Sequence, residues 1–309
     1  MIAIDLGSNT LRVIAYDCTT QQVVYRYEKV VKTADGLSTF GFVNSNAVCR
    51  VINALHEVQT QLDFEGQTLR AVTTHTLRIA SNATAVLAEI KDVTGIDFEI
   101  ISAQEEARLS LRAVEQRLET LPHTPEAFVL VDVGGGSTEV TFVYPYETLT
   151  KSFPIGIVTM TQKYQTSQAM QKARNQEMLA IQMFCANVYS SRGKPDTFVA
   201  TAGTPTSIAA MKLGFNHKSY DPSQINGTLL EKYELDIYLQ KLLDMPHEMR
   251  EHTVGTGRSD LIATGVLIYT HLYTLLEFDT CMVIDDGLRE GVAIEMCFPK
   301  TSPKNFTSL

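Results

Sequence analysis

Apolar positions along this chain follow two periods, one typical of β-strands and one typical of α-helices. Short apolar runs of strand length lie at residues 2–6, 10–17, 23–31, 69–74, 97–101, 127–132, 138–144, 150–154, 196–203 and 280–285. Longer stretches with helical spacing lie between them, at 45–62, 83–95, 103–118, 170–191, 204–214, 228–243, 259–276 and 288–296. Strands that alternate with helices predict an α/β fold with mixed sheets flanked by helices.

One sequence unit occurs twice, near the start of each half of the chain. The segment IAIDLGSNTLRVIAYD, at Ile2–Asp17, aligns with VLVDVGGGSTEVTFVY, at Val129–Tyr144. In this alignment Asp5 falls on Asp132, the glycine two residues later is shared, and most flanking apolar positions coincide. A strand, an aspartate, a turn and a second strand therefore form a duplicated unit.

The duplication predicts two domains, at residues 1–124 and 125–287, and a chain of 309 residues is long enough for both. The polar, proline-containing segment LPHTPEA at 121–127 is expected to be the hinge between them. Residues 299–309, after the last helical stretch, are expected to form a disordered tail.

Composition and charge narrow the class of protein. Hydrophobic residues make up 44% and charged residues 20%, as in globular proteins, and the net charge of −9 disfavours a general nucleic-acid or membrane-surface binder. No basic segment precedes the first strand, so we expect no secretory signal. The most apolar helical segment, LIATGVLIYTHLYTLLEF, includes polar residues and is expected to be buried. Five widely spaced cysteines favour a reducing cytoplasm and no zinc site.

The two aligned turns are candidate anion sites. Successive backbone N–H groups can point into one concavity where glycine removes the Cβ, and such nests bind phosphate. A single loop such as Gly134-Gly135-Gly136 could be a flexible hairpin turn. Two related loops, each directly after a strand-terminal aspartate, favour the gripping of a phosphate chain from both sides.

Carboxylates beside these turns suggest a metal. A carboxylate next to a phosphate repels it unless a cation lies between them, so Asp5, Asp132 and Glu139 are candidate magnesium ligands, directly or through water. The structural alternative for both aspartates is the capping of a turn.

The segment SAQEEARL predicts the start of a helix and a candidate general base. Ser102 and Glu105 match a capping box, in which Glu105 reaches back to the residue before the helix. Glu106 has no such role and lies in the first turn, at the strand-to-helix edge where α/β sites form. The alternative is a surface glutamate favoured by the helix dipole.

Two arginines and a third glycine loop complete the candidates. Arg78, in THTLR just beyond a strand, could contact phosphate oxygens, or it could pair with a carboxylate. The loop TAGTPTS at 201–207 begins a helix and could bind an anion or simply cap the helix. Arg258, in GRSDL, is a candidate distal anion contact.

These motifs in this order resemble a known family. A duplicated strand–Asp–Gly-loop–strand unit with a later glycine loop is similar to the actin, sugar-kinase and Hsp70 ATPase superfamily. Within it, AIDLGSNTLR, THTLRIASNA, EIISAQEEARL, VLVDVGGGSTEV, GRSDLIATGVLI and DDGLREG resemble the exopolyphosphatase / guanosine pentaphosphate phosphohydrolase family. The resemblance runs from Ile2 to about Met296.

The resemblance implies two ribonuclease-H-like lobes with an active-site cleft between them. It also implies that the closing helix, 288–298, packs on the first lobe. By the same resemblance Glu106 is the catalytic glutamate, and Asp132 and Glu139 bind Mg²⁺ or another divalent cation, with Asp5 as a further candidate. The implied substrate phosphate contacts are Gly7, Ser8, Asn9, Arg78, Gly134, Gly135, Gly136, Ser137 and Thr138.

The chain also departs from the family pattern. Long members carry a further helical C-terminal region, whereas this sequence resembles the short, two-lobe subgroup. TAGTPTS stands where the family often has a double glycine, and SNTLR replaces a more usual SNSF-like start. The missing double glycine in TAGTPTS puts a nucleotide contact at that loop in question.

The expected activity is magnesium-dependent release of the terminal phosphate from linear polyphosphate, conversion of guanosine pentaphosphate to the tetraphosphate, or both. Glu106 would activate water, in a cytoplasmic protein that could form a homodimer. Three alternatives stay open at this point. One is a catalytically weak regulator that binds guanosine tetraphosphate or pentaphosphate, another is a kinase of the same superfamily, and the third is an actin-like filament protein.

Overall fold

The computed structural model describes residues 1–164, 166–299 and 305–308, which form two compact units. Unit 1 comprises the described residues of Met1–Ala113 and Gly287–Pro303, and unit 2 those of Val114–Asp286 and Lys304–Leu309. The division falls inside helix α5 (Ala103–Leu118), earlier in the chain than the hinge expected near residue 124. A continuous helix therefore crosses the division, and the segment LPHTPEA belongs to unit 2.

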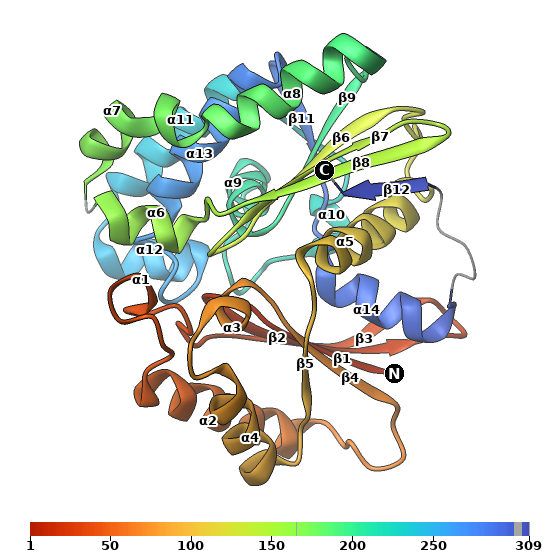
Figure 1. The fold of residues 1–309 in the computed structure, drawn as a ribbon, viewed down its shortest axis with the longest axis vertical. Helices are drawn as coiled ribbons and strands as arrows, with labels where there is room; N and C mark the ends of the chain where they lie inside the picture. The colour runs from red at the N-terminus through yellow and green to blue at the C-terminus, as the bar shows by residue number, and fades with distance from the viewer. Residues whose placement is uncertain (165, 300–304, 309) are drawn as a thin grey trace. The chain divides into compact units, whose positions relative to one another are not determined.

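Unit 1 is built on a five-stranded mixed sheet of order β3-β2-β1-β4-β5. β1 (Ile2–Leu6), β2 (Thr10–Asp17) and β3 (Gln22–Val30) are antiparallel neighbours, and β4 (Leu69–Thr73) and β5 (Phe98–Ile100) continue the sheet in parallel. α14 (Leu288–Cys297) and the first part of α5 bury one face through apolar residues such as Val292 and Leu109. α2 (Ser45–Gln61) and α4 (Ala83–Thr94) lie on the other face (Figure 1).

Unit 2 is built on a seven-stranded mixed sheet of order β10-β11-β9-β6-β7-β8-β12. β6 (Phe128–Val133), β7 (Thr138–Val143) and β8 (Glu147–Phe153) are antiparallel, and β9 (Thr197–Thr201) runs parallel to β6. This is the arrangement of β1, β2, β3 and β4 in unit 1. The duplicated sequence unit therefore forms the same hairpin at the centre of each sheet.

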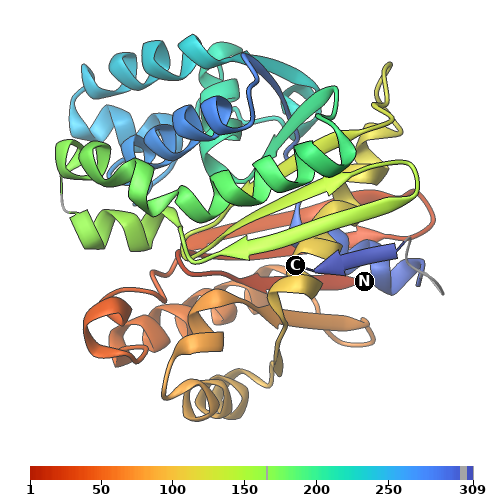
Figure 2. The same ribbon diagram turned by 45° about the horizontal axis from the view of Figure 1, so that its top comes forward.

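The remaining elements of unit 2 are helices and edge strands. The helices are α6 (Ile157–Tyr164), α7 (Ser167–Glu177), α8 (Leu179–Arg192), α9 (Gly203–Lys212), α10 (Pro222–Ile225), α11 (Lys232–Leu243), α12 (His247–Val254) and α13 (Ile262–Leu275). The edge strands are β10 (Thr228–Glu231), which pairs with β11 (Thr280–Val283), and β12 (Asn305–Ser308), which pairs with β8. Figure 2 shows dark-blue β12 beside yellow-green β8.

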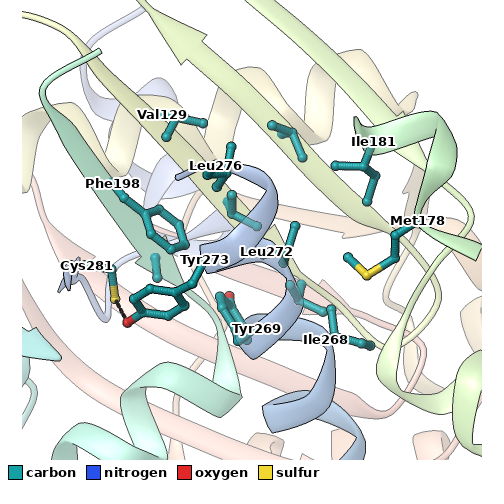
Figure 3. Packing of buried hydrophobic residues seen from close by; sticks show 14 of the residues in the cluster. Val129, Met178, Ile181, Phe198, Ile268, Tyr269, Leu272, Tyr273, Leu276 and Cys281 are labelled. Carbon is teal, nitrogen blue, oxygen red and sulfur yellow. Dashed lines mark hydrogen bonds between the residues drawn. The ribbon is translucent and has the colours of Figure 1, made fainter. Parts of the chain in front are cut away.

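The core of unit 2 packs α13 against the sheet. Figure 3 shows Tyr269, Leu272 and Tyr273 of α13 pointing toward side chains of the strands, including Phe198. The Tyr273 hydroxyl also donates to the sulfur of Cys281, at 2.9 Å. The most apolar helical segment is therefore a buried core helix, as its polar residues predicted.

The predicted fold class is confirmed, because both sheets are mixed and flanked by helices. Several element boundaries are wrong. The helix expected at 228–243 begins with strand β10, and the helix expected at 170–191 is two helices, α7 and α8. Short α1 (Leu37–Phe40), α3 (His75–Ile79), α6, α10 and α12 were not predicted, because brief helices carry too little periodicity.

The expected disordered tail is corrected in part. Residues 305–308 form β12, which extends the sheet in parallel with β8. The pairing partner lies far away in the sequence, so a local pattern could not show it. Residues 300–304 and 309 lie outside the described part of the chain.

Two cysteines are bonded, a result that the wide spacing of the five did not predict. Cys18 and Cys297 form a disulfide that joins the end of β2 to the end of α14, with the Cα atoms 5.5 Å apart. Cys185 and Cys281 are free and buried, and burial raises the pKa of each thiol to about 12. Among the described residues, none of the helices combines the length and the apolar character that a membrane crossing requires.

Candidate active site

The turn after β1 is held by the segment that follows β3. The Gly7 N–H donates to the Thr10 carbonyl at 3.0 Å and closes the hairpin. The Ser8 carbonyl accepts from Ala34, and the Asn9 carbonyl accepts from residues 31 and 32, at 2.8–2.9 Å. The carbonyl groups of the turn are therefore fixed by residues 31–34. The N–H groups of Ser8 and Asn9 donate to no residue that the structure describes.

The turn after β6 repeats this arrangement in unit 2. The Gly134 N–H donates to the Ser137 carbonyl at 2.9 Å, and the Thr138 hydroxyl donates to the Ile155 carbonyl. The first N–H groups of α6, from residues 157–159, donate to the carbonyls of Gly134 and Gly135 at 2.8–3.2 Å. The N–H groups of Gly135 and Gly136 have no acceptor within the described ranges, so they are available to an anion.

Gly156 allows this close approach of α6 to the turn. A Cβ built on Gly156 would lie 2.4 Å from backbone atoms of both Gly135 and Gly136. Backbone atoms cannot move aside as the end of a flexible side chain can. Any residue other than glycine at position 156 must therefore displace the turn. Gly156 is therefore part of the candidate site although it follows the motif by 20 residues (156 − 136).

We expect Gly156→Ala to lower kcat/KM for phosphate release by on the order of 10²-fold, because small displacements of positioning groups cost about that much. Far-ultraviolet circular dichroism would check that the fold persists. Gly193→Ala is the control, since a Cβ there meets nothing within 4 Å, although its φ of +84° will cost some stability. Unchanged kinetics of Gly156→Ala would show that the position of the turn is not needed.

The two strand-terminal aspartates differ in the residue that faces each across its hairpin. Asp5 pairs in register with Arg12, whose guanidinium lies 3.7 Å from the carboxylate. Asp132 pairs in register with Glu139, a like charge. Like charges directly opposite each other destabilise a sheet unless a cation or a proton offsets them. Strand register thus places a cation opposite Asp5 and a second carboxylate opposite Asp132.

The Asp132–Glu139 pair lies in a row of oxygen-bearing side chains across the sheet. Thr201 on β9 is in register with Asp132, and Ser152 on β8 is in register with Glu139. Glu139 is only 4% exposed, and its carboxylate accepts a hydrogen bond from the Ser152 hydroxyl at 2.6 Å. Within the described ranges no three His, Cys, Asp or Glu side chains cluster in a way that could hold a metal ion.

Glu106 and Arg78 meet in unit 1. Arg78 Nη1 lies 2.8 Å from Glu106 Oε2 and also donates to the Ile101 carbonyl at 3.0 Å. Both side chains are mostly buried, at 18% and 14% exposed. The sequence had proposed a phosphate contact or a carboxylate partner for Arg78, and the structure shows the carboxylate partner. Burial and the Arg78 charge lower the pKa of His75, so Arg78 supplies the positive charge of α3 at neutral pH.

The first turn of α5 forms half of the predicted capping box. Ser102 Oγ accepts from the Glu105 N–H at 3.1 Å, as predicted. The Glu105 carboxylate is bound by Arg108 instead, at 2.8 and 2.9 Å, and these bonds lower its pKa. Glu105 therefore has a structural partner, but a different one from that expected.

The TAGTPTS loop begins α9 with an unusual backbone. Ala202 adopts φ 75° and ψ −178°, a region that is almost exclusive to glycine. A Cβ on the next residue, Gly203, would meet nothing within 4 Å. The loop thus keeps a glycine-like conformation at a position where the sequence has alanine.

We expect Ala202→Gly to raise the free energy of unfolding by about 1 kcal/mol, because it relieves a strain of roughly 1–3 kcal/mol and adds some chain entropy to the unfolded state. Urea denaturation measures the change. Ala209→Gly, in the buried interior of α9, should lower the same quantity by about 1 kcal/mol. A loss of stability in Ala202→Gly would contradict the expectation.

Arg258 lies in a tight turn of unit 2. Its N–H donates to the Gly255 carbonyl at 3.2 Å, and its carbonyl accepts from Leu261 at the start of α13. Glu251 accepts from the Gly257 N–H and from the Ser259 hydroxyl, so it fixes the same turn. The part of Arg258 in anion binding stays a prediction.

Comparison with known proteins decides the family. The model of the Ppx/GppA phosphatase family matches residues 13–298 of the chain. The chain belongs to this family. The predicted resemblance is thereby confirmed, and membership of this family makes the protein a phosphatase.

Relatives of this Ppx/GppA chain match it over nearly its whole length. Exopolyphosphatase 2 of Mycobacterium tuberculosis is 26% identical, with 95% of this chain and 97% of the relative covered. The crystal structure of the Aquifex aeolicus Ppx/GppA family member is 26% identical, covers 98% of both chains and has a TM-score of 0.72. An exopolyphosphatase from Cytophaga hutchinsonii, 22% identical over 95% of this chain and 96% of its own, shares the fold with a TM-score of 0.82.

Sequence reasoning missed four residues of this Ppx/GppA chain that bear on the site. Strand register places Arg12 opposite Asp5 and Ser152 opposite Glu139. Gly156 lies where a Cβ would meet the backbone of the β6 turn, and Thr76 donates a hydrogen bond to Ser8. The repeat alignment contained one signal, since Arg12 and Glu139 fall on the same position (12 + 127 = 139). The other three could not be found without the tertiary structure.

Proposed function

We propose that this protein hydrolyses the terminal phosphoanhydride of linear polyphosphate and converts guanosine pentaphosphate to the tetraphosphate. The observation that carries the proposal is the turn after β6. There the N–H groups of Gly135 and Gly136 have no acceptor among the described residues, and the turn follows directly on the opposed Asp132–Glu139 pair. The name of the Mycobacterium tuberculosis relative, an exopolyphosphatase, supports polyphosphate as the substrate. The carboxylates and amides together suit a metal-phosphate ligand.

Asp132 and Glu139 fit Mg²⁺ or another divalent cation. Mg²⁺ usually binds through one or two carboxylates and completes its shell with water and substrate phosphates, so a pair is enough. The two opposed negative charges would attract a cation, and the Ser152 hydroxyl holds the Glu139 carboxylate in place. When bound, the ion would neutralise charge that develops on the phosphate oxygens.

Glu106 is proposed as the base that orients and deprotonates the attacking water. Its carboxylate is mostly buried and held by Arg78, so its direction is fixed before substrate binds. The proton of water passes to Glu106, the water oxygen bonds to the terminal phosphorus, and the bridging oxygen leaves with the shortened chain. Arg78, which donates to both Glu106 and the Ile101 carbonyl, keeps that carboxylate beside a positive charge.

The substrate class follows from which groups are available. Backbone N–H groups, an arginine and a carboxylate pair all address phosphates, and no residue pattern commits the chain to a guanine base. We therefore propose that any linear phosphate terminus that fits is accepted, and that base recognition adds no selectivity. A kinase would need ATP and an acceptor, and a regulator would bind without releasing phosphate.

The test is phosphate release from polyphosphate with Mg²⁺ and no other substrate. We expect release, and we expect guanosine tetraphosphate to inhibit it competitively because both ligands need the same amides. The measurement is a KM for polyphosphate that rises with tetraphosphate while kcat stays constant. Purely non-competitive inhibition would indicate two sites, and no release would overturn the proposed function.

A further inference from the structure

A buried hydrogen bond joins the first phosphate turn to the short helix α3. Thr76 Oγ1 donates to Ser8 Oγ at 2.9 Å, and the two residues are 1% and 4% exposed. Both belong to unit 1, on elements that are 68 residues apart (76 − 8) in the chain. Two buried hydroxyls thus form one pair with a defined donor.

The direction of this bond leaves one proton unused. Because Thr76 is the donor, one lone pair of the Ser8 oxygen accepts its proton, and the Ser8 hydroxyl proton points elsewhere. That proton has no acceptor among the residues that the structure describes. A buried hydroxyl without an acceptor costs free energy, and a phosphate oxygen at the turn would supply the acceptor.

The same helix also positions the candidate base. Arg78, two residues after Thr76, holds Glu106 at 2.8 Å and the Ile101 carbonyl at 3.0 Å. The preceding strand is fixed as well, since the Thr73 hydroxyl donates to the Leu6 carbonyl at 2.8 Å. One turn of helix therefore connects the phosphate turn at one end to the Glu106–Arg78 pair at the other.

We propose that Thr76 is a positioning residue that turns the Ser8 hydroxyl toward substrate, so that Ser8 donates to a phosphate oxygen. This inference rests on the proposed function, since it concerns the same phosphate site. The bond from Ser8 to an anionic oxygen is charge-assisted and stronger than a neutral one. Without Thr76, the Ser8 hydroxyl rotates freely and its proton is no longer directed.

The test measures binding of tripolyphosphate by calorimetry in the Glu106→Gln protein, in which turnover is expected to be strongly reduced. We expect Thr76→Val and Ser8→Ala each to raise the Kd about tenfold, the size of a roughly 1.4 kcal/mol interaction. The double variant should bind no more weakly than Ser8→Ala alone, because both changes remove one interaction. Thr76→Ser, which keeps the hydroxyl, should restore the Kd to that of the parent.

A purely structural role gives a different pattern. Thr94→Val is the matched control, since the buried Thr94 hydroxyl donates to the Ile90 carbonyl and accepts from the Ile96 N–H, both at the end of α4. It should lower the melting temperature and leave the Kd unchanged. If Thr76→Val behaves in the same way, or if its effect adds to that of Ser8→Ala, the positioning role is overturned. Failure of the wild-type protein to release phosphate would instead overturn the proposed function.

Discussion

Glu106→Gln is expected to lower kcat for phosphate release by roughly 10²–10⁴-fold, the usual contribution of a general base. Glutamine keeps the shape of the side chain and can still accept a hydrogen bond from Arg78, so the first turn of α5 should stay intact. It cannot take a proton from water at neutral pH. The loss should therefore fall on kcat, while the Kd for tripolyphosphate changes little. Steady-state release of phosphate and calorimetric binding measure the two quantities.

Glu105→Gln is the matched control for this prediction. Glu105 precedes Glu106 in the same turn, but its carboxylate is bound by Arg108 and lies 3.6 Å from Arg70. Loss of these ion pairs should cost stability, by about 1 kcal/mol or less for such partly exposed pairs, and should leave kcat within a few-fold. If Glu105→Gln is inactive and Glu106→Gln is normal, the roles of the two glutamates must be exchanged.

Asp132→Asn and Glu139→Gln are expected to lower kcat by at least about 100-fold at fixed Mg²⁺, since even indirect partners of a metal are worth roughly 10–100-fold. Each change removes one of two opposed carboxylates, and so removes both a ligand and the local excess of negative charge. The Mg²⁺ concentration for half-maximal activity should rise. Binding of Mn²⁺, followed by electron paramagnetic resonance without substrate, should weaken in parallel.

A carboxylate elsewhere on the same sheet gives the control for the metal site. Glu147, at the start of β8, pairs with Arg192 on the surface, and Glu147→Gln should change neither the Mg²⁺ requirement nor Mn²⁺ binding. EDTA in excess should abolish phosphate release by the wild-type protein, and added Mg²⁺ should restore it. Full activity in EDTA would show that the Asp132–Glu139 pair serves another purpose.

The elements of the fold could be predicted well where periodicity is long or turn chemistry is local. β1, β2 and β6 match their predicted ranges closely, and α5 begins and ends at the predicted residues. The strand β10 was hidden, because its four residues continue an apolar pattern that α11 also satisfies. The tail strand β12 was missed because only its partner β8 makes it a strand.

Candidate site residues were found where one short motif carries the chemistry. Glycine turns, strand-terminal aspartates and Glu106 stand out from their neighbours along the chain. Partners far apart in sequence do not: the Glu106–Arg78 contact spans 28 residues and the Cys18–Cys297 disulfide spans 279. Gly156 also gives no local signal, because the need for glycine comes from the backbone of Gly135 and Gly136.

The sequence by itself determined the duplicated unit, the mixed α/β class, the family and the positions of both turns, because backbone preferences and apolar period act over a few neighbouring residues. Only the tertiary structure decided what each motif faces. Asp5 and Asp132 occupy the same place in the repeat, yet strand register sets Arg12 opposite the first and Glu139 opposite the second. Electrostatic energy depends on distance in space, so the same local motif has an opposite charge across the hairpin in unit 1 and a like charge in unit 2.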